Sequence, residues 1–87
     1  MSSGNVGDHA TAMLKHALAG PAHRRDLLAA AGLAQVAVNH QRHVLPLVDA
    51  GLLALAIPDH PRSPRQRYLI TDTGRQFLAA RIIGADA

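Results

Sequence analysis

Apolar residues recur at helical spacing in the first quarter of the chain. Five of them follow the i, i+3, i+4, i+7, i+8 pattern of one helix face: Ala10, Met13, Leu14, Ala17 and Leu18. Asp8 is a suitable N-cap or first-turn residue, and Gly20 with Pro21 would end the helix. The pattern therefore predicts an amphipathic helix over about residues 8–19.

Two more helices are predicted close behind the first. The second covers about residues 24–31, turns Leu27, Leu28 and Ala31 inward, and ends at Gly32. Its N-terminus lacks a good cap, because Ala22 and His23 precede it.

The third helix covers about residues 35–50. Its predicted apolar stripe consists of Ala37, Gln41, Val44, Leu47 and Val48. Pro46 lies inside it, so we expect a kink or a new helical start near Leu45. Since only Gly32 and Leu33 clearly separate the second and third helices, the pair is typical of a helix-turn-helix.

The pattern changes after Gly51. Residues 52–57 form a short apolar run and residues 67–71 alternate, so both predict strands. Three prolines lie between them and predict a loop. A last helix would be capped by Thr71 or Asp72, with an apolar face made of Phe77, Leu78 and Ile82. Any strand before the second helix would be confined to residues 21–23.

This order of elements predicts a mainly α fold with a small β-hairpin wing, a winged helix-turn-helix. We expect one domain over residues 8–83, with a flexible N-terminal tail at 1–7 and a C-terminal tail at 84–87. Hydrophobic residues make up 48% of the 87 residues, enough for a core, but aromatic residues only 2%, so the core must be aliphatic.

Composition excludes some classes of protein. Without cysteine, neither a disulfide framework nor a thiolate zinc site can form. No apolar run reaches the roughly 20 residues that a membrane span needs, and no secretory signal is visible. We therefore expect a cytoplasmic protein without a membrane partner.

Positive charge is clustered along the chain. The formal net charge is +3, and the arginines gather at 24–25 and at 62, 65 and 67, with no acid inside either group. A planar guanidinium can bond two phosphate oxygens at once, so these clusters favour a nucleic-acid partner. A GC-rich genome explains the preference for arginine over lysine equally well.

Residues 43–74 resemble the winged-helix domain at the C-terminus of many Fic-type proteins and of RecG-like transcriptional regulators. The residues that match are Pro46, Leu47, Ala50, Gly51, Leu52, Ile57, Pro58, Asp59, Pro61, Ser63, Gln66, Tyr68, Thr71 and Gly74. The chain departs from the family pattern at His23, Asn39 and His60, where a Ser or Thr cap, an aromatic residue and a lysine are common. The catalytic Fic motif and an ATP-binding glycine-rich segment are absent, so the resemblance implies the accessory domain alone.

We expect three groups of residues to bind double-stranded DNA. The recognition helix would read base edges in the major groove, the wing would contact the backbone or minor groove, and the start of the second helix would hold a phosphate. The three sets are Gln35, Asn39, His40, Arg42 and His43 on the helix; Arg62, Ser63, Arg65, Gln66 and Arg67 on the wing; and Arg24 with Arg25 before them.

Functions other than DNA binding are also compatible with the sequence. The main alternative is a protein-interaction or dimerisation module. A homodimer could use the apolar residues Leu53, Leu55, Ile82 and Ile83, which we expect to be exposed. His40 and His43 at i, i+3 spacing lack further ligands for a metal. We expect no cofactor, no metal, no small-molecule ligand and no enzymatic activity.

Overall fold

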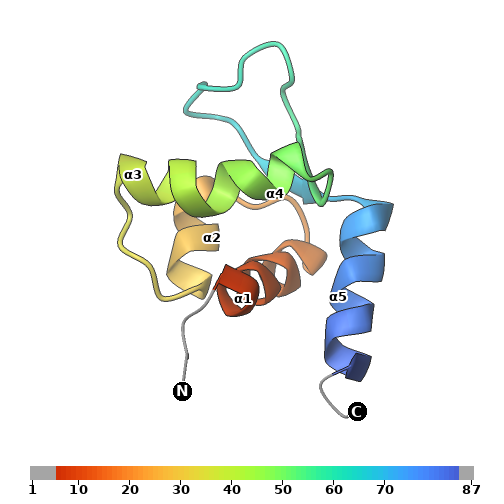
Figure 1. Cartoon of the computed structure of the whole chain (residues 1–87). Coiled ribbons are helices and arrows are strands. Elements are labelled where there is room, and N and C mark those ends of the chain that lie inside the picture. Colours follow the sequence, from red (N-terminus) through yellow and green to blue (C-terminus); the bar gives the residue numbers. More distant parts are fainter. Residues whose placement is uncertain (1–5, 85–87) are drawn as a thin grey trace.

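The computed structural model describes residues 6–84, with side chains at residues 9–81. The elements, in order, are α1 (Val6–Leu18), α2 (Arg24–Ala30), α3 (Ala37–Asn39), the π-helical turn η1 (His40–Val44), α4 (Leu45–Asp49), β1 (Leu53–Leu55), β2 (Tyr68–Ile70) and α5 (Asp72–Gly84). The chain is mainly helical with a two-stranded antiparallel hairpin, and it has the predicted winged-helix layout (Figure 1). None of the described helices is long and apolar enough to cross a lipid bilayer.

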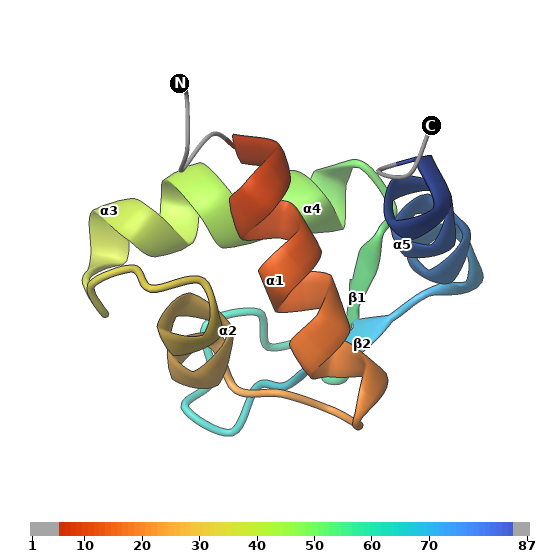
Figure 2. The ribbon, with the colours of Figure 1, turned by 90° about the horizontal axis from the view of Figure 1, so that it is seen from below.

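Helix α1 lies at the centre of the domain, in contact with α2, η1, β2 and α5 (Figure 2). Four of its five predicted core residues, Ala10, Met13, Leu14 and Ala17, are buried with Leu27, Leu28, Val44, Leu47 and Leu78. Leu18 is 49% exposed, so its predicted burial is wrong, because α1 ends there and the chain turns away. Helix α1 begins at Val6, two residues before the predicted boundary.

The segments α3, η1 and α4 form one continuous helical rod (Figure 1). Pro46 lacks the N–H that would bond the carbonyl four residues back, and the π-helical turn directly precedes α4. The irregularity predicted near Leu45, as a kink or a new helical start, is therefore present as a π-helical turn within the rod. Because the wider turn shifts the faces of the rod, Ala37 and Gln41 are exposed, and their predicted place on the core stripe is wrong.

The hairpin is shorter than predicted. Leu53 pairs with Ile70 and Leu55 with Tyr68, and residues 56–67 form the wing loop. Ala22 extends this sheet by one bridge: its N–H donates to the Tyr68 carbonyl (3.0 Å), and the Tyr68 N–H donates back (2.8 Å). The short strand at residues 21–23 is thus a single antiparallel bridge.

Two apolar residues proposed for a dimer interface are not exposed. Leu53 is buried and Leu55 is half-buried against the core, so that prediction is wrong for both. Both side chains lie on the inner face of the hairpin, which packs on the helices. The side chains of Ile82 and Ile83, like most of the two predicted tails, lie outside the described residues.

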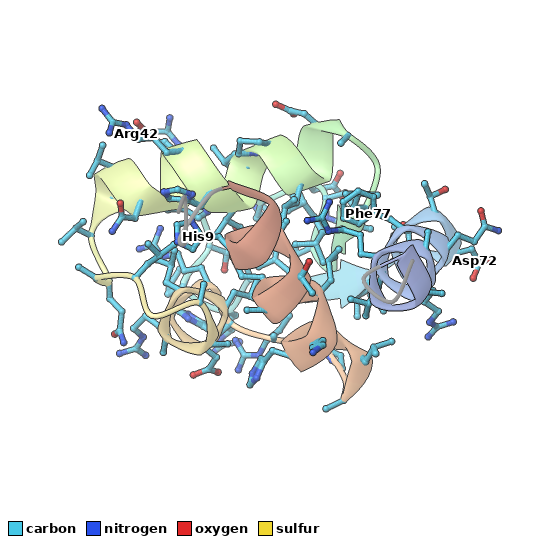
Figure 3. All side chains as sticks on the ribbon, turned by 60° about the horizontal axis from the view of Figure 1, so that its bottom comes forward. His9, Arg42, Asp72 and Phe77 are labelled. Carbon is cyan, nitrogen blue, oxygen red and sulfur yellow. The ribbon has the colours of Figure 1, made fainter. Side chains whose placement is uncertain are left out.

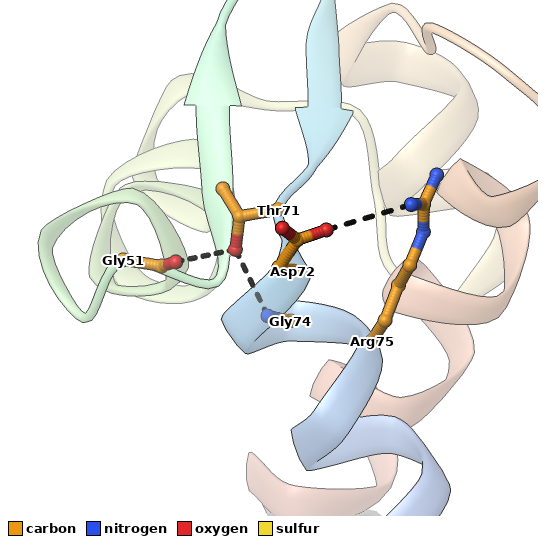
Figure 4. Close-up of polar contacts among 5 residues, drawn as sticks. All are labelled: Gly51, Thr71, Asp72, Gly74 and Arg75. Carbon is orange, nitrogen blue, oxygen red and sulfur yellow. Dashed lines mark hydrogen bonds and ion pairs between the residues drawn. The ribbon is translucent and has the colours of Figure 1, made fainter.

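Thr71, one of the two predicted caps, is the residue that caps α5. Its Oγ1 accepts a hydrogen bond from the Gly74 N–H (2.9 Å) and donates one to the Gly51 carbonyl (2.6 Å), as Figure 4 shows. The cap therefore ties the start of α5 to the end of α4. Asp72 follows in the first turn of α5, and its Oδ1 lies 3.7 Å from Arg75 Nη1.

Gly74 marks a close approach between α5 and the start of β1. A Cβ atom there would clash with the Leu52 carbonyl oxygen and press on the Ile70 side chain. We expect Gly74→Ala to lower the free energy of unfolding by about 1–3 kcal/mol, because backbone atoms would have to move. Urea denaturation measures this. The exposed neighbour Thr73 is the control: Thr73→Ala should change stability by no more than about 0.5 kcal/mol, and equal effects would refute the close contact.

Candidate nucleic-acid interface

The start of α2 is capped by a histidine and joined to the wing. His23 Nδ1 accepts from the Arg25 N–H (3.2 Å), and Nε2 lies 3.3 Å from the Pro64 carbonyl. With Nδ1 as acceptor, the proton of a neutral ring is on Nε2, which then donates to Pro64. The prediction that His23 is a poor cap is wrong, since its ring both caps α2 and holds the wing loop.

Gln66 closes the wing loop from within. It is only 4% exposed, and its Oε1 accepts from the Ile57 N–H (2.8 Å). Its Nε2 donates to the carbonyls of Ile57 (2.7 Å) and His60 (2.9 Å). All its polar atoms are engaged inside the loop, so this position does not support the predicted contact of Gln66 with DNA.

Of the other predicted wing residues, Ser63 stabilises a turn of the loop and the three arginines expose positive charge. Ser63 Oγ accepts from the Arg65 N–H (3.1 Å), a side-chain turn bond. Arg67 Nη1 lies 3.5 Å from the Arg65 carbonyl. Arg62, Arg65 and Arg67 are exposed, and in the described part of the chain the ion pair that forms is on α5, between Arg75 and Asp72. Asp59 and Asp72 therefore leave the wing arginines unneutralised.

Three cavities join the wing, the start of α2 and the start of α3 into one surface. The first, hereafter the wing cleft, measures about 360 Å³ and lies between residues 23–25 and 61–64, with Gln66 and Tyr68 on its inner wall. The second brings Arg25 beside Gln35 and Arg67. The third brings Arg24 and Arg25 to residues 35–37.

Arg25 lines all three cavities. The pair Arg24 and Arg25, predicted to hold a phosphate, therefore lies between the wing and the start of α3. The surface so formed carries Arg24, Arg25, Arg62 and Arg67 from segments far apart in sequence. Among the described residues that line it, Asp26 is the single carboxylate. Arg65 is exposed and does not line these three cavities.

The predicted recognition residues divide into two groups. Gln35 and Arg42 are exposed, and Figure 3 shows Arg42 pointing away from the core. Asn39, His40 and His43 are partly buried and make internal contacts: Asn39 Nδ2 donates to the Ala34 carbonyl (2.8 Å) and fixes the turn before α3. These three side chains are therefore structural, and their positions do not support base contacts.

The exposed face of the rod carries residues that the sequence did not single out. Val36 and Val38 are 49% and 45% exposed, and Gln41 is exposed beside Arg42. The signal that could have identified them is Pro46, since a π-helical turn ahead of a proline moves the outer face by about one residue.

His40 joins the rod to the hairpin. Its Nε2 lies 2.8 Å from the Tyr68 hydroxyl. Burial, and then the positive charge of Arg24, lowers the pKa of His40, so the ring is neutral near pH 7. Burial raises the pKa of Tyr68, which keeps its phenol proton as a hydrogen-bond donor.

His43 contacts α1. Its ring meets the ring of His9 edge to face, with centroids 4.8 Å apart. The Nδ1 atoms of both rings are buried and have no hydrogen-bond partner among the described residues. Figure 3 places His9 where α1 meets the rod. The pKa of His43 is lowered mainly by burial and further by electrostatic interaction with His9 and Arg42. Within the described residues, no three metal-ligating side chains gather here.

One family model matches most of the chain. It is described as the Filamentation induced by cAMP protein Fic-like, C-terminal domain, and it covers residues 8–71. No curated protein and no solved structure is significantly similar to the chain. The further resemblance to RecG-like regulators stays a prediction.

The clasp in the wing can be tested by exchange of one amide. Gln66→Leu leaves the Ile57 N–H without its partner and removes one of the two hydrogen bonds that each of the Ile57 and His60 carbonyls accepts, so we expect a loss of about 1–3 kcal/mol in stability. The Ile57 amide should then exchange with deuterium faster than in the original protein. Gln76 is exposed on α5, and Gln76→Leu should leave this amide unchanged. Equal exchange in all three proteins would contradict the clasp.

The histidine contact predicts a loss of stability in acid. The folded-state pKa of His43 lies below its ordinary value of 6.5, so the unfolded chain binds the proton first as pH falls. Stability should be complete above about pH 6.5 and decline below it until the folded-state pKa is passed. We expect His43→Asn to weaken the pH dependence measured by thermal unfolding.

The exposed His16 provides the comparison for this experiment. His16→Asn should preserve the original pH profile. A His43→Asn profile identical to that of the unchanged protein would show that this ring does not contribute to the acid sensitivity.

Proposed function

Since the chain belongs to the Fic-like C-terminal domain family, we propose that it binds double-stranded DNA, as a small transcriptional regulator or as the DNA-targeting domain of a larger protein. The family match covers an accessory domain, so we propose no catalytic step. The proposal concerns the surface made by the wing, the start of α2 and the start of α3.

The observation that carries the proposal is the convergence of arginines on that surface. Arg24 and Arg25 come from α2, and Arg62 and Arg67 from the wing, with one acid, Asp26, among the residues lining the cavities. Guanidinium groups gathered in this way favour a polyanion, because each phosphate contact releases condensed counterions. These side chains would fix the register of the domain on the duplex.

The outer face of the rod would then read the major groove. Arg42 can bond a guanine edge and Gln35 or Gln41 an adenine edge. Val36 and Val38, both nearly half exposed, can pack on thymine methyl groups. This set differs from the one expected from sequence, because three of the predicted residues are partly buried and make contacts within the domain.

The alternative is a protein-interaction module, for which the exposed Val36 and Val38 would serve as apolar anchors. Salt dependence separates the two functions. With about four to six phosphate contacts, DNA affinity should fall with a log–log slope of about −4 to −5 against salt concentration. A protein-interaction module would not retard duplex DNA even at low salt.

Two double variants with equal charge loss test the proposed surface. Arg24→Ala with Arg62→Ala removes one cation from each side of the wing cleft. We expect weaker binding to random duplex DNA and a salt slope shallower by about 2, one unit for each lost contact. Fluorescence anisotropy at several salt concentrations measures both quantities.

The matched control is Lys15→Ala with Arg75→Ala, two exposed cations on α1 and α5. Neither residue lines the proposed surface, so affinity and slope should stay close to those of the original protein. Equal losses in the two double variants would reduce the binding to net charge alone, and the proposed surface would be rejected.

A further inference from the structure

The wing cleft has the dimensions of a small-ligand site. Its volume of about 360 Å³ falls in the range of about 300–1,000 Å³ that is usual for such sites. Gln66 and Tyr68 line it although they are only 4% and 2% exposed, so the cleft reaches inward to the base of the hairpin. A duplex would contact only the outer guanidinium groups, whereas a molecule of few atoms could reach the inner wall.

The charge of the wing cleft selects an anion. Arg24, Arg25 and Arg62 line it together with His23, and none of the described carboxylates does. The positive charge of Arg24 also acts at the inner end of the cleft. After burial, it is the second cause that shifts the pKa values of His40 and Tyr68, and it lowers both. Planar guanidinium groups on two sides match the several oxygens of a phosphate better than the two of a carboxylate.

The two walls of the cleft are already held together. His23 Nε2 bonds the Pro64 carbonyl (3.3 Å) across it, and Gln66 fixes the loop from residue 57 to residue 60. A ligand would therefore bind without first having to order the loop, which lowers the entropic cost of binding. Pro61 and Pro64 offer an apolar surface beside the arginines for the rest of the molecule.

We propose that the wing cleft binds a small phosphate monoester, with the phosphate between Arg24 and Arg62 and the organic part against the two prolines. Binding to the cleft does not depend on the DNA-binding function. Where both hold, one consequence rests on the proposed function: the ligand and the duplex share Arg24, Arg25 and Arg62, so the ligand competes with DNA and regulates its binding.

Amide chemical shifts of the ¹⁵N-labelled protein test this without DNA. The probes are glycerol 3-phosphate, inorganic phosphate and uncharged glycerol, at constant ionic strength. We expect saturable shifts at residues 23–25 and 61–66 with glycerol 3-phosphate, weaker binding of inorganic phosphate, and no shifts with glycerol. Absence of saturation with both phosphates, or equal shifts with glycerol, would overturn the proposal.

Single variants locate the contacts. Arg62→Gln should weaken binding of glycerol 3-phosphate by about tenfold, as the loss of one charge-assisted hydrogen bond implies. Arg42→Gln is the control, because Arg42 is exposed on the rod and does not line the cleft. Equal weakening by the two variants would overturn the assignment of the site. Circular dichroism verifies that both variants are folded.

A competition experiment keeps the two proposals distinguishable. Glycerol 3-phosphate should displace a labelled duplex more effectively than the same ionic strength of sodium chloride. If the protein binds the phosphate ester but no duplex, the DNA-binding function fails and the cleft proposal stands. If it binds the duplex but neither phosphate probe, the cleft proposal alone fails.

Discussion

Tyr68 is the residue on which the arrangement of the domain depends. Its backbone exchanges two hydrogen bonds with Ala22 and pairs across the hairpin with Leu55. Its ring is buried, and its hydroxyl bonds His40 on the rod at 2.8 Å. This one residue thus connects the segment before α2 and the base of the wing through its backbone, and the rod through its side chain.

This connection determines where the charges lie. The bridge at Ala22 brings the start of α2 against the wing, and His23 then bonds Pro64 of the loop. Arg24 and Arg25, the next residues, therefore face Arg62 across the wing cleft. Helix α5 lies at the other end of the domain from α3 (Figures 1 and 2), away from this surface.

Local signals predicted most of the fold, and long-range contacts account for what they missed. Thr71 as a cap and Pro46 as a break act on residues a few positions away, so both could be predicted from sequence. The role of Gln66 inside the loop and the bond of His23 to the wing could not be predicted, because their partners, Ile57 and Pro64, lie 9 and 41 positions away. The capping bond of His23 to the Arg25 N–H is local, but histidine is not among the preferred N-cap residues. A polar residue in a loop has the same local pattern whether it faces solvent or a carbonyl.

Hydrogen–deuterium exchange of the protein with and without duplex DNA tests the central claim most directly, since it reports on every segment of the chain at once. The account predicts that DNA slows exchange together at the start of α2, in residues 35–42 and in the wing loop, and leaves α5 unchanged. Protection of α5 instead, or of the rod without the wing and α2, would contradict a single DNA-binding surface.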